Sequence, residues 1–167
     1  MIVWVEGVDG SGKSELVKKL RETYGYGLAP IPTHRLRPTD AQAEAERQKW
    51  CEWFNKYRNE HKPLIAERGH ISEIIYRIND GDKTYLNAGM LAEHMQGTKI
   101  ILCKTETAFE DAMKRGEDSI NTPGVHAKIQ NDYEVIVAAL CKFFGCDCMN
   151  YDWRKQDISE VIKFINN

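Results

Sequence analysis

The sequence has few of the residues that mark several large classes of protein. It holds only five cysteines and no C-x-x-C pair, so we expect neither a disulfide framework nor a paired-cysteine zinc site. Twelve glycines and five prolines among 167 residues exclude collagen-like and low-complexity chains. No apolar run approaches the roughly 18 residues that span a bilayer, so we expect no membrane partner. A formal net charge of −2 gives no overall field that would hold nucleic acid nonspecifically.

The residues that are present are typical of a globular enzyme domain. Hydrophobic residues make up 42% of the chain and charged residues 29%, and 167 residues are enough to enclose a core. We therefore expect a single domain over residues 1–167. The N-terminal segment MIVWVE has neither the basic start nor the cleavage site of a signal peptide, so we expect a cytoplasmic protein.

Short β-branched or apolar runs alternate along the chain with longer amphipathic stretches. This pattern is typical of parallel strands joined by crossover helices, so the predicted fold class is α/β. The predicted strands cover 2–5, 28–31, 63–67, 99–103 and 146–151. The predicted helices cover 13–24, 40–59, 72–78, 85–95, 107–115, 125–144 and 158–165, and a surface loop is predicted for 116–124.

A complete phosphate-binding motif connects the first predicted strand to the first predicted helix. The segment GVDGSGKS at 7–14 fits the pattern G-x-x-x-x-G-K-[ST]. Its glycines let backbone N–H groups curl around phosphates, Lys13 reaches the outer phosphates, and the Ser14 hydroxyl can bind magnesium. A chance glycine turn is the alternative, but the strand–loop–helix context favours the motif. We predict that ATP and Mg²⁺ bind here, through Gly7, Asp9, Gly10, Ser11, Gly12, Lys13 and Ser14.

Three segments then indicate which class of phosphate-binding protein this is. The chain has no N-K-x-D motif and no switch segments, so a small-molecule kinase is favoured over a GTPase or a motor. The segment EGVDGSGKS at 6–14 resembles E-G-x-D-G-x-G-K-[ST] of thymidylate kinases. The segment ERG at 67–69 is similar to the D-R-[YFH] motif of thymidylate kinases and the E-R-S motif of deoxynucleoside kinases. The segment KRGED at 114–118 resembles the arginine-bearing lid of the same families.

The resemblance implies both a fold and a lid. The implied fold is the three-layer α/β P-loop NTPase fold of nucleoside monophosphate kinases, with a mostly parallel five-stranded sheet in the order 2-3-1-4-5. The lid is expected around residues 114–124.

Two carboxylates are candidates for the acceptor or metal side of the site. In thymidylate kinases the aspartate of the phosphate loop approaches the nucleotide sugar and the metal, a role that the resemblance gives to Asp9. Glu67 ends a predicted strand, where α/β sheets place their ligands, so it can act as a general base or hold magnesium through water. The alternatives are a turn-forming Asp9 and a surface Glu67 paired with Arg68.

Two arginines are candidates for contacts with phosphates. By resemblance Arg68 is the substrate-side arginine of the D-R motif, and its planar set of donors suits a phosphate. Arg115, and less surely Lys114, can enter the site when the lid closes and neutralise charge on the phosphoryl oxygens. For Arg115, an exposed position at a helix end is the alternative. The predicted catalytic residues are Lys13, Asp9, Glu67, Arg68 and Arg115.

Four aromatic residues share one face of the second predicted helix, at Trp50, Trp53, Phe54 and Tyr57. Such a stripe is more often core than a platform for a base. Its place before the third strand nevertheless corresponds to where the resembled families bind the nucleobase. The predicted substrate contacts are therefore Arg35, Trp53, Tyr57 and Arg68.

The acceptor side departs from both families. Nucleoside kinases that phosphorylate a sugar hydroxyl keep a glutamate after the second strand, where this chain reads PTHR at 32–35. Thymidylate kinases keep an aspartate where this chain has Glu67, and an aromatic residue where it has Gly69. We predict transfer of the γ-phosphoryl group from ATP to a deoxynucleotide-like acceptor. A hydroxyl kinase acting on a nucleoside or on a hydroxymethyl pyrimidine in phage DNA stays open, as do an ATPase module and a homodimer.

Overall fold

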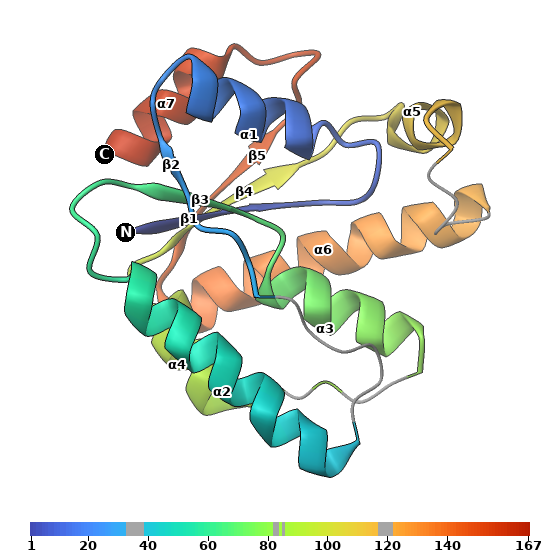
Figure 1. The fold of residues 1–167 in the computed structure, drawn as a ribbon. Helices are drawn as coiled ribbons and strands as arrows, with labels where there is room; N and C mark the ends of the chain where they lie inside the picture. The colour runs from blue at the N-terminus through green and yellow to red at the C-terminus, as the bar shows by residue number, and fades with distance from the viewer. Residues whose placement is uncertain (33–38, 82–83, 85, 117–121) are drawn as a thin grey trace.

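A parallel β-sheet forms the centre of the molecule. The computed structural model describes residues 1–32, 39–81, 84, 86–116 and 122–167. Within these residues, five parallel strands lie in the order β2-β3-β1-β4-β5 (Figure 1). They are β1 (Ile2–Glu6), β2 (Gly27–Leu28), β3 (Leu64–Glu67), β4 (Lys99–Cys103) and β5 (Asp147–Tyr151). The predicted α/β class and strand order are confirmed.

Helices cover both faces of this sheet and give the molecule three layers (Figure 1). One face is covered by α1 (Lys13–Glu22) and α7 (Ile158–Asn166). The other is covered by α2 (Asp40–Tyr57), α3 (His70–Asn79), α4 (Ala88–Met95) and α6 (Pro123–Phe144), and α5 (Ala108–Lys114) follows β4. Because strand side chains alternate, Val3 and Val5 pack against α1 and α7, whereas Ile2 and Trp4 pack on the opposite face. None of the helices in the described part of the chain has the length and apolar character needed to cross a membrane.

The edge strand β2 is shorter than predicted. It contains two residues, whereas the sequence predicts a strand over 28–31. The Ala29 N–H still donates to the Ile65 carbonyl at 2.8 Å, and the next carbonyl, that of Pro30, accepts from the Trp53 indole instead of from the sheet. The strand therefore ends at Leu28, three residues before the predicted end at residue 31.

Several helix boundaries also differ from the prediction, and side-chain caps mark the new starts of α4 and α6. Helix α3 begins at His70 rather than at residue 72, and α4 begins at Ala88 rather than at 85, after Asn87 accepts a hydrogen bond from the Met90 N–H at 2.9 Å. Helix α6 begins at Pro123, where the Thr122 side chain caps its first turn. Residues 123–124 of the predicted lid are therefore helical, and residues 117–121 lie outside the described part of the chain.

An aromatic cluster fills the core between the sheet and α2, α3 and α4. Trp50 of α2 is 1% exposed, and its ring centroid lies 6.5 Å from that of Trp4 and 4.5 Å from that of His70. His70 Nε2 and His94 Nδ1 are 2.7 Å apart and share a hydrogen bond inside this cluster. Burial lowers the pKa of His70 well below its ordinary value, so the pair is uncharged at neutral pH.

Candidate active site

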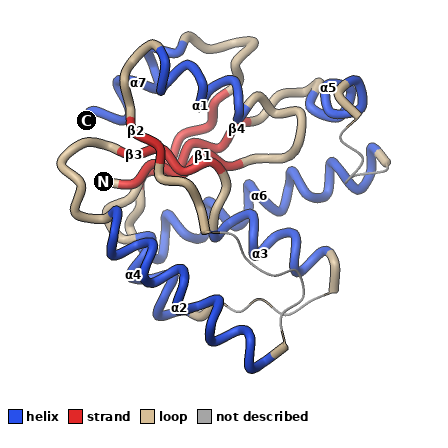
Figure 2. The backbone as a smooth tube through the Cα atoms, viewed as in Figure 1, coloured by secondary structure: helices blue, strands red, loops and turns tan. Residues whose placement is uncertain are grey.

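The predicted phosphate-binding loop connects β1 to α1, at the end of the sheet where β4 leads toward α5 (Figure 2). Gly7 and Gly10 have positive φ angles of 139° and 82°. A Cβ at Gly7 would collide with the Cys103 carbonyl, and one at Gly10 with the backbone of Ala108. Only glycine fits these two positions, and the loop that they form is the kind whose N–H groups surround a phosphate.

The Lys13 ammonium lies inside this loop. Its side chain is 5% exposed, and Nζ donates to the Val8 carbonyl at 2.6 Å and lies 4.0 Å from Asp9 Oδ1. Burial, followed by the nearby Arg68 charge, lowers the pKa of Lys13 to about 8. A bound phosphate would add further opposite charge beside this desolvated cation and so favour its charged form.

Two oxygen donors meet beside Lys13. The Ser14 hydroxyl at the start of α1 donates to Glu67 Oε1 at the end of β3, at 2.6 Å. No group of three or more histidine, cysteine or carboxylate side chains suitable for a metal occurs in the described ranges. A hydroxyl and one carboxylate are nevertheless the hard oxygen donors that magnesium uses when phosphates and water supply its other ligands. This donor set therefore fits Mg²⁺.

Arg68 is held in place on the opposite side of the loop. It forms an ion pair with Asp9, and its Nη1 donates to the Tyr76 hydroxyl at 3.4 Å. Its φ of 63° is the one positive value recorded for a non-glycine residue in the part of the chain that the structure describes. Such a conformation costs about 1–3 kcal/mol and persists where the surroundings fix it, as the two side-chain contacts do here.

These side chains line one small cavity of about 120 Å³. Its walls are formed by Asp9, Gly10, Gly12, Lys13, Ser14, Glu67, Arg68 and Arg115. The structure thus brings together all five residues predicted to be catalytic. Arg115, which directly follows α5, reaches the cavity, whereas Lys114 is 76% exposed and its ammonium lies 3.9 Å from the Asp111 carboxylate.

The predicted base-binding residues are placed differently. Trp53 is 6% exposed, its ring centroid lies 5.3 Å from that of Trp4, and Nε1 donates to the Pro30 carbonyl at 2.6 Å. Tyr57 packs against the same cluster, with its ring centroid 5.5 Å from that of Trp53. The aromatic stripe belongs to the core, which is the alternative that its spacing already favours. Arg35 lies outside the described residues.

Three residues near the cavity were not predicted from the sequence. The carboxyl of Glu6 is fully buried at the end of β1, and its place in the EGVDGSGKS segment was the available signal. Tyr76, which contacts Arg68, lies two helical turns further on and carries no motif. His126 of α6 lies with Nε2 3.0 Å from the Asp9 carbonyl, a contact between positions 117 residues apart that no local pattern indicates.

Comparison with known proteins shows to which fold this geometry belongs. No protein-family model and no curated protein matches the sequence. Among solved structures, the YorR protein of Bacillus subtilis, determined in complex with phosphorylated GDP, matches at a TM-score of 0.71 and 19% identity, over 99% of this chain and 94% of that one. Thymidylate kinase from Candida albicans matches at 0.64 and 15% identity, over 99% and 90% of the two chains. Deoxyadenosine kinase from M. mycoides, with bound dATP, matches at 0.61 and 14% identity, over 100% and 98%.

These similarities cover whole chains at low identity. The protein therefore has the P-loop fold found in nucleoside and nucleotide kinases, as the resemblance in its motifs implies.

Proposed function

We propose that this protein is a kinase that transfers the γ-phosphoryl group of ATP to a deoxynucleoside monophosphate. The observation that carries the proposal is the 120 Å³ cavity, where Lys13 and Arg115 meet Arg68 beside the phosphate loop. Catalysis of phosphoryl transfer consists mainly of positioning and of neutralising charge on the phosphoryl oxygens. Three cations around one small cavity can position the phosphates and neutralise the charge on their oxygens.

The lack of a carboxylate in the described residues after β2 favours a phosphate acceptor over a hydroxyl acceptor, which would need a general base. The described residues that follow β2 are Ala29, Pro30, Ile31 and Pro32, which carry no carboxylate. Asp9 is paired with Arg68, and Glu67 accepts from Ser14, so both carboxylates lie beside the groups proposed to hold the acceptor phosphate and the metal. A monophosphate already has a nucleophilic oxyanion and needs no general base. The planar guanidinium of Arg68 suits such a phosphate.

The proposed reaction uses magnesium, for which the cavity edge offers two oxygen ligands. Ser14 and Glu67 would hold the ion, since their oxygens lie 2.6 Å apart at the edge of the cavity. The ion would supply positive charge to the phosphate oxygens. Glu67 then organises the metal, and Arg68 and Asp9 form the acceptor side.

The other acceptors that the sequence leaves open remain alternatives. The similarity to a deoxyadenosine kinase supports a nucleoside hydroxyl as the next candidate. A hydroxymethyl pyrimidine in phage DNA would use the same donor side. The homodimer stays an open alternative, and the cytoplasmic location remains a prediction.

The test is transfer of labelled γ-phosphate from ATP to a panel of acceptors, with Lys13→Ala as the blank. The panel contains deoxynucleoside monophosphates, free nucleosides, and DNA that carries hydroxymethyl pyrimidines. We expect label on a monophosphate, and a loss of roughly 10²–10³-fold in Lys13→Ala because the lost charge acts on the phosphates. Circular dichroism of both proteins verifies that the variant remains folded.

The other outcomes of this test are equally informative. Label on a nucleoside or on DNA would overturn the monophosphate proposal and require Asp9 or Glu67 as a base. ATP turnover without any labelled acceptor would indicate an ATPase module. Wild-type rates in Lys13→Ala would remove the phosphate loop from the mechanism.

A further inference from the structure

One buried side chain contacts the phosphate loop and has no part in the proposed chemistry. His126 of α6 is 5% exposed, and its Nε2 lies 3.0 Å from the carbonyl oxygen of Asp9, 117 residues away along the chain. A carbonyl oxygen can only accept a hydrogen bond, so Nε2 carries a proton and donates it. A ring from a distant helix therefore holds a backbone group of the phosphate loop.

This hydrogen bond orients the peptide between Asp9 and Gly10. The C=O and N–H groups of a trans peptide point in opposite directions. Because the Asp9 carbonyl is held toward α6, the Gly10 N–H points away from α6. Gly10 lines the cavity, and within the described residues its N–H donates no hydrogen bond to the protein. This N–H is therefore available to a phosphate oxygen.

The glycine does not fix this peptide by itself. Rotation of the peptide changes the ψ angle of Asp9 and the φ angle of Gly10, and glycine adopts positive and negative φ values about equally well. After such a rotation the Asp9 carbonyl, rather than an N–H, would face the cavity and repel a phosphate. The contact from His126 opposes this rotation.

The same peptide is also held from the side of α5. The backbone of Gly10 packs directly on that of α5, where a Cβ would collide with the Ala108 carbonyl. His126 reaches this helix as well, since its ring centroid lies 5.7 Å from that of Phe109 in an edge-on contact. Helices α5 and α6 therefore meet each other and the phosphate loop at His126.

We propose that His126 is a positioning residue: its imidazole N–H holds the Asp9–Gly10 peptide so that the Gly10 N–H faces the phosphates of ATP. The inference rests on the proposed function, since it takes ATP as the phosphoryl donor. Asp9 is then fixed at both ends, by Arg68 at its carboxylate and by His126 at its carbonyl. A donor that is already oriented costs no reorganisation when charge develops on the phosphates.

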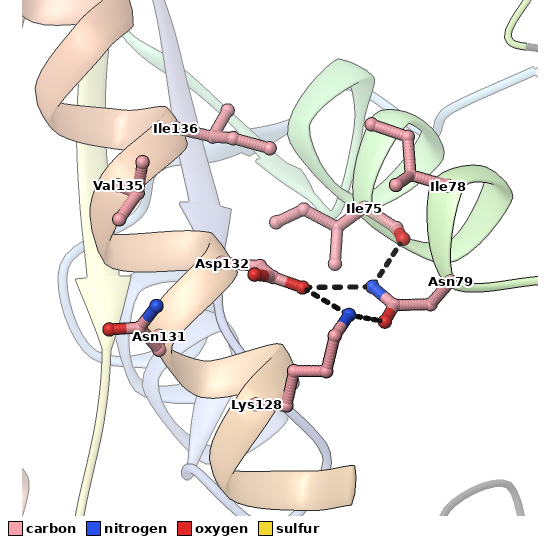
Figure 3. A pocket seen from close by; sticks show the side chains of 8 residues that line it. All are labelled: Ile75, Ile78, Asn79, Lys128, Asn131, Asp132, Val135 and Ile136. Atoms are coloured by element: carbon pink, nitrogen blue, oxygen red, sulfur yellow. Dashed lines mark hydrogen bonds and ion pairs between the residues drawn. The ribbon is translucent and has the colours of Figure 1, made fainter.

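A separate set of contacts on α6 supplies a control. Figure 3 shows Asp132 of α6, which accepts from Asn79 of α3 at 3.0 Å and from Lys128 at 3.1 Å. Lys128 also donates to Asn79. This surface clamp of Asn79, Lys128 and Asp132 lines a groove between α3 and α6 and does not line the phosphate cavity. It can therefore be weakened without removing any contact to the loop.

The experiment measures the Kd for ATP by titration calorimetry, without an acceptor. His126→Phe keeps a ring beside Phe109 but has no N–H, whereas His126→Gln keeps an amide N–H of similar reach. We expect the Kd to rise about tenfold in His126→Phe and to stay within about twofold of wild type in His126→Gln. Asp132→Ala should lower the Tm and leave the Kd as it is.

Three outcomes would overturn the proposal. Wild-type affinity in His126→Phe would show that the contact does not orient the loop. Equal losses in His126→Phe and His126→Gln would show that the N–H is not what matters. A loss in Asp132→Ala as large as that in His126→Phe would mean that any loosening of α6 weakens ATP binding.

A second measurement uses the wild type and depends on no variant being folded. The nitrogen NMR signals of the His126 ring show which nitrogen carries a proton, and a proton on Nδ1 alone would contradict the proposal. On addition of ATP the amide proton of Gly10 should shift downfield, as expected of a donor to phosphate, and an unchanged signal would overturn the proposal. Neither result involves an acceptor. Absence of monophosphate phosphorylation would overturn the proposed function and leave the role of His126 standing.

Discussion

The first turn of α3 sends two polar side chains into two different interiors. His70 and Ser72 are two residues apart, so they lie on nearly opposite sides of the helix, and both are buried. His70 enters the aromatic core, where its hydrogen-bond partner is His94. Ser72 enters the region beneath the phosphate loop, where it donates to Glu6. One helical turn therefore belongs both to the packing core and to the candidate site.

The difference between the two interiors is one of charge. Burial lowers the pKa of His94 to about 4, so the histidine pair stays neutral among its aromatic neighbours. Burial also raises the pKa of Glu6 to about 7, but Ser72, Arg68 and Lys13 act against that shift and favour the charged form. The first cluster stabilises the fold, and the second keeps charge available near the cavity.

The largest effect on the free energy of unfolding is expected in the aromatic core. Trp50→Ala should lower the free energy of unfolding by about 3–5 kcal/mol, because the ring is 1% exposed and its removal leaves a cavity. Urea unfolding followed by circular dichroism measures this loss. Phe143→Ala is the control, since Phe143 is 74% exposed and its removal should change the free energy by no more than about 0.5 kcal/mol. Equal losses in both variants would contradict the placement of Trp50 in the core.

A smaller loss of stability is expected when the contact to the buried Glu6 carboxyl is removed. Ser72→Ala should cost about 1–3 kcal/mol, because it removes the hydroxyl that donates to the buried Glu6 carboxyl, whose other oxygen has no partner among the described residues. The loss should be greater at pH 8 than at pH 5.5, since the pKa of Glu6 is about 7 and the charged form needs the hydrogen bond more. In a Glu6→Gln background the pH dependence of this loss should disappear. A loss that is the same at both pH values would mean that Glu6 is not the group that Ser72 stabilises.

The parts of the structure that could be predicted are those encoded by neighbouring residues. The segment at 7–14 predicts the phosphate loop because its glycine spacing and its lysine act within one turn of chain. Alternating apolar runs predict the strands, and β4 has its predicted bounds. Glu67 and Arg68 could be placed at the site because strand ends meet at one edge of a parallel sheet.

The predictions that failed concern features that depend on contacts between residues far apart in the sequence. A helical aromatic stripe has the same spacing whether it binds a base or packs in the core, and only the approach of Trp4 places Trp53 in the core. Glu6 looks like the polar end of an apolar strand, and its buried contact is with the Ser72 hydroxyl, 66 residues away along the chain. Sequence spacing carries no signal for such contacts.

The smallest expected effect is the change in the free energy of unfolding per pH unit. This change also distinguishes the two interiors most directly. A histidine whose pKa is lowered by folding takes up a proton more readily when unfolded, so stability falls as the pH drops from about 6.5 toward 4. Glu6, whose pKa is raised from 4.5 to about 7, has the opposite effect, and its contribution to stability falls as the pH rises through that window. Each group changes the free energy of unfolding by up to about 1.4 kcal/mol per pH unit.

Between pH 4.5 and 6.5 the two clusters therefore oppose each other, and single substitutions reveal each one. His94→Gln keeps a hydrogen-bonding partner for His70 but cannot be protonated, so the free energy of unfolding should rise less steeply with pH than in wild type. Glu6→Gln should make the same rise steeper, because the opposing group is gone. Urea unfolding at half-unit pH steps gives the three slopes, and comparison with wild type cancels the surface carboxylates. Slopes that change in the same direction in both variants would show that the two sides of α3 do not differ in charge.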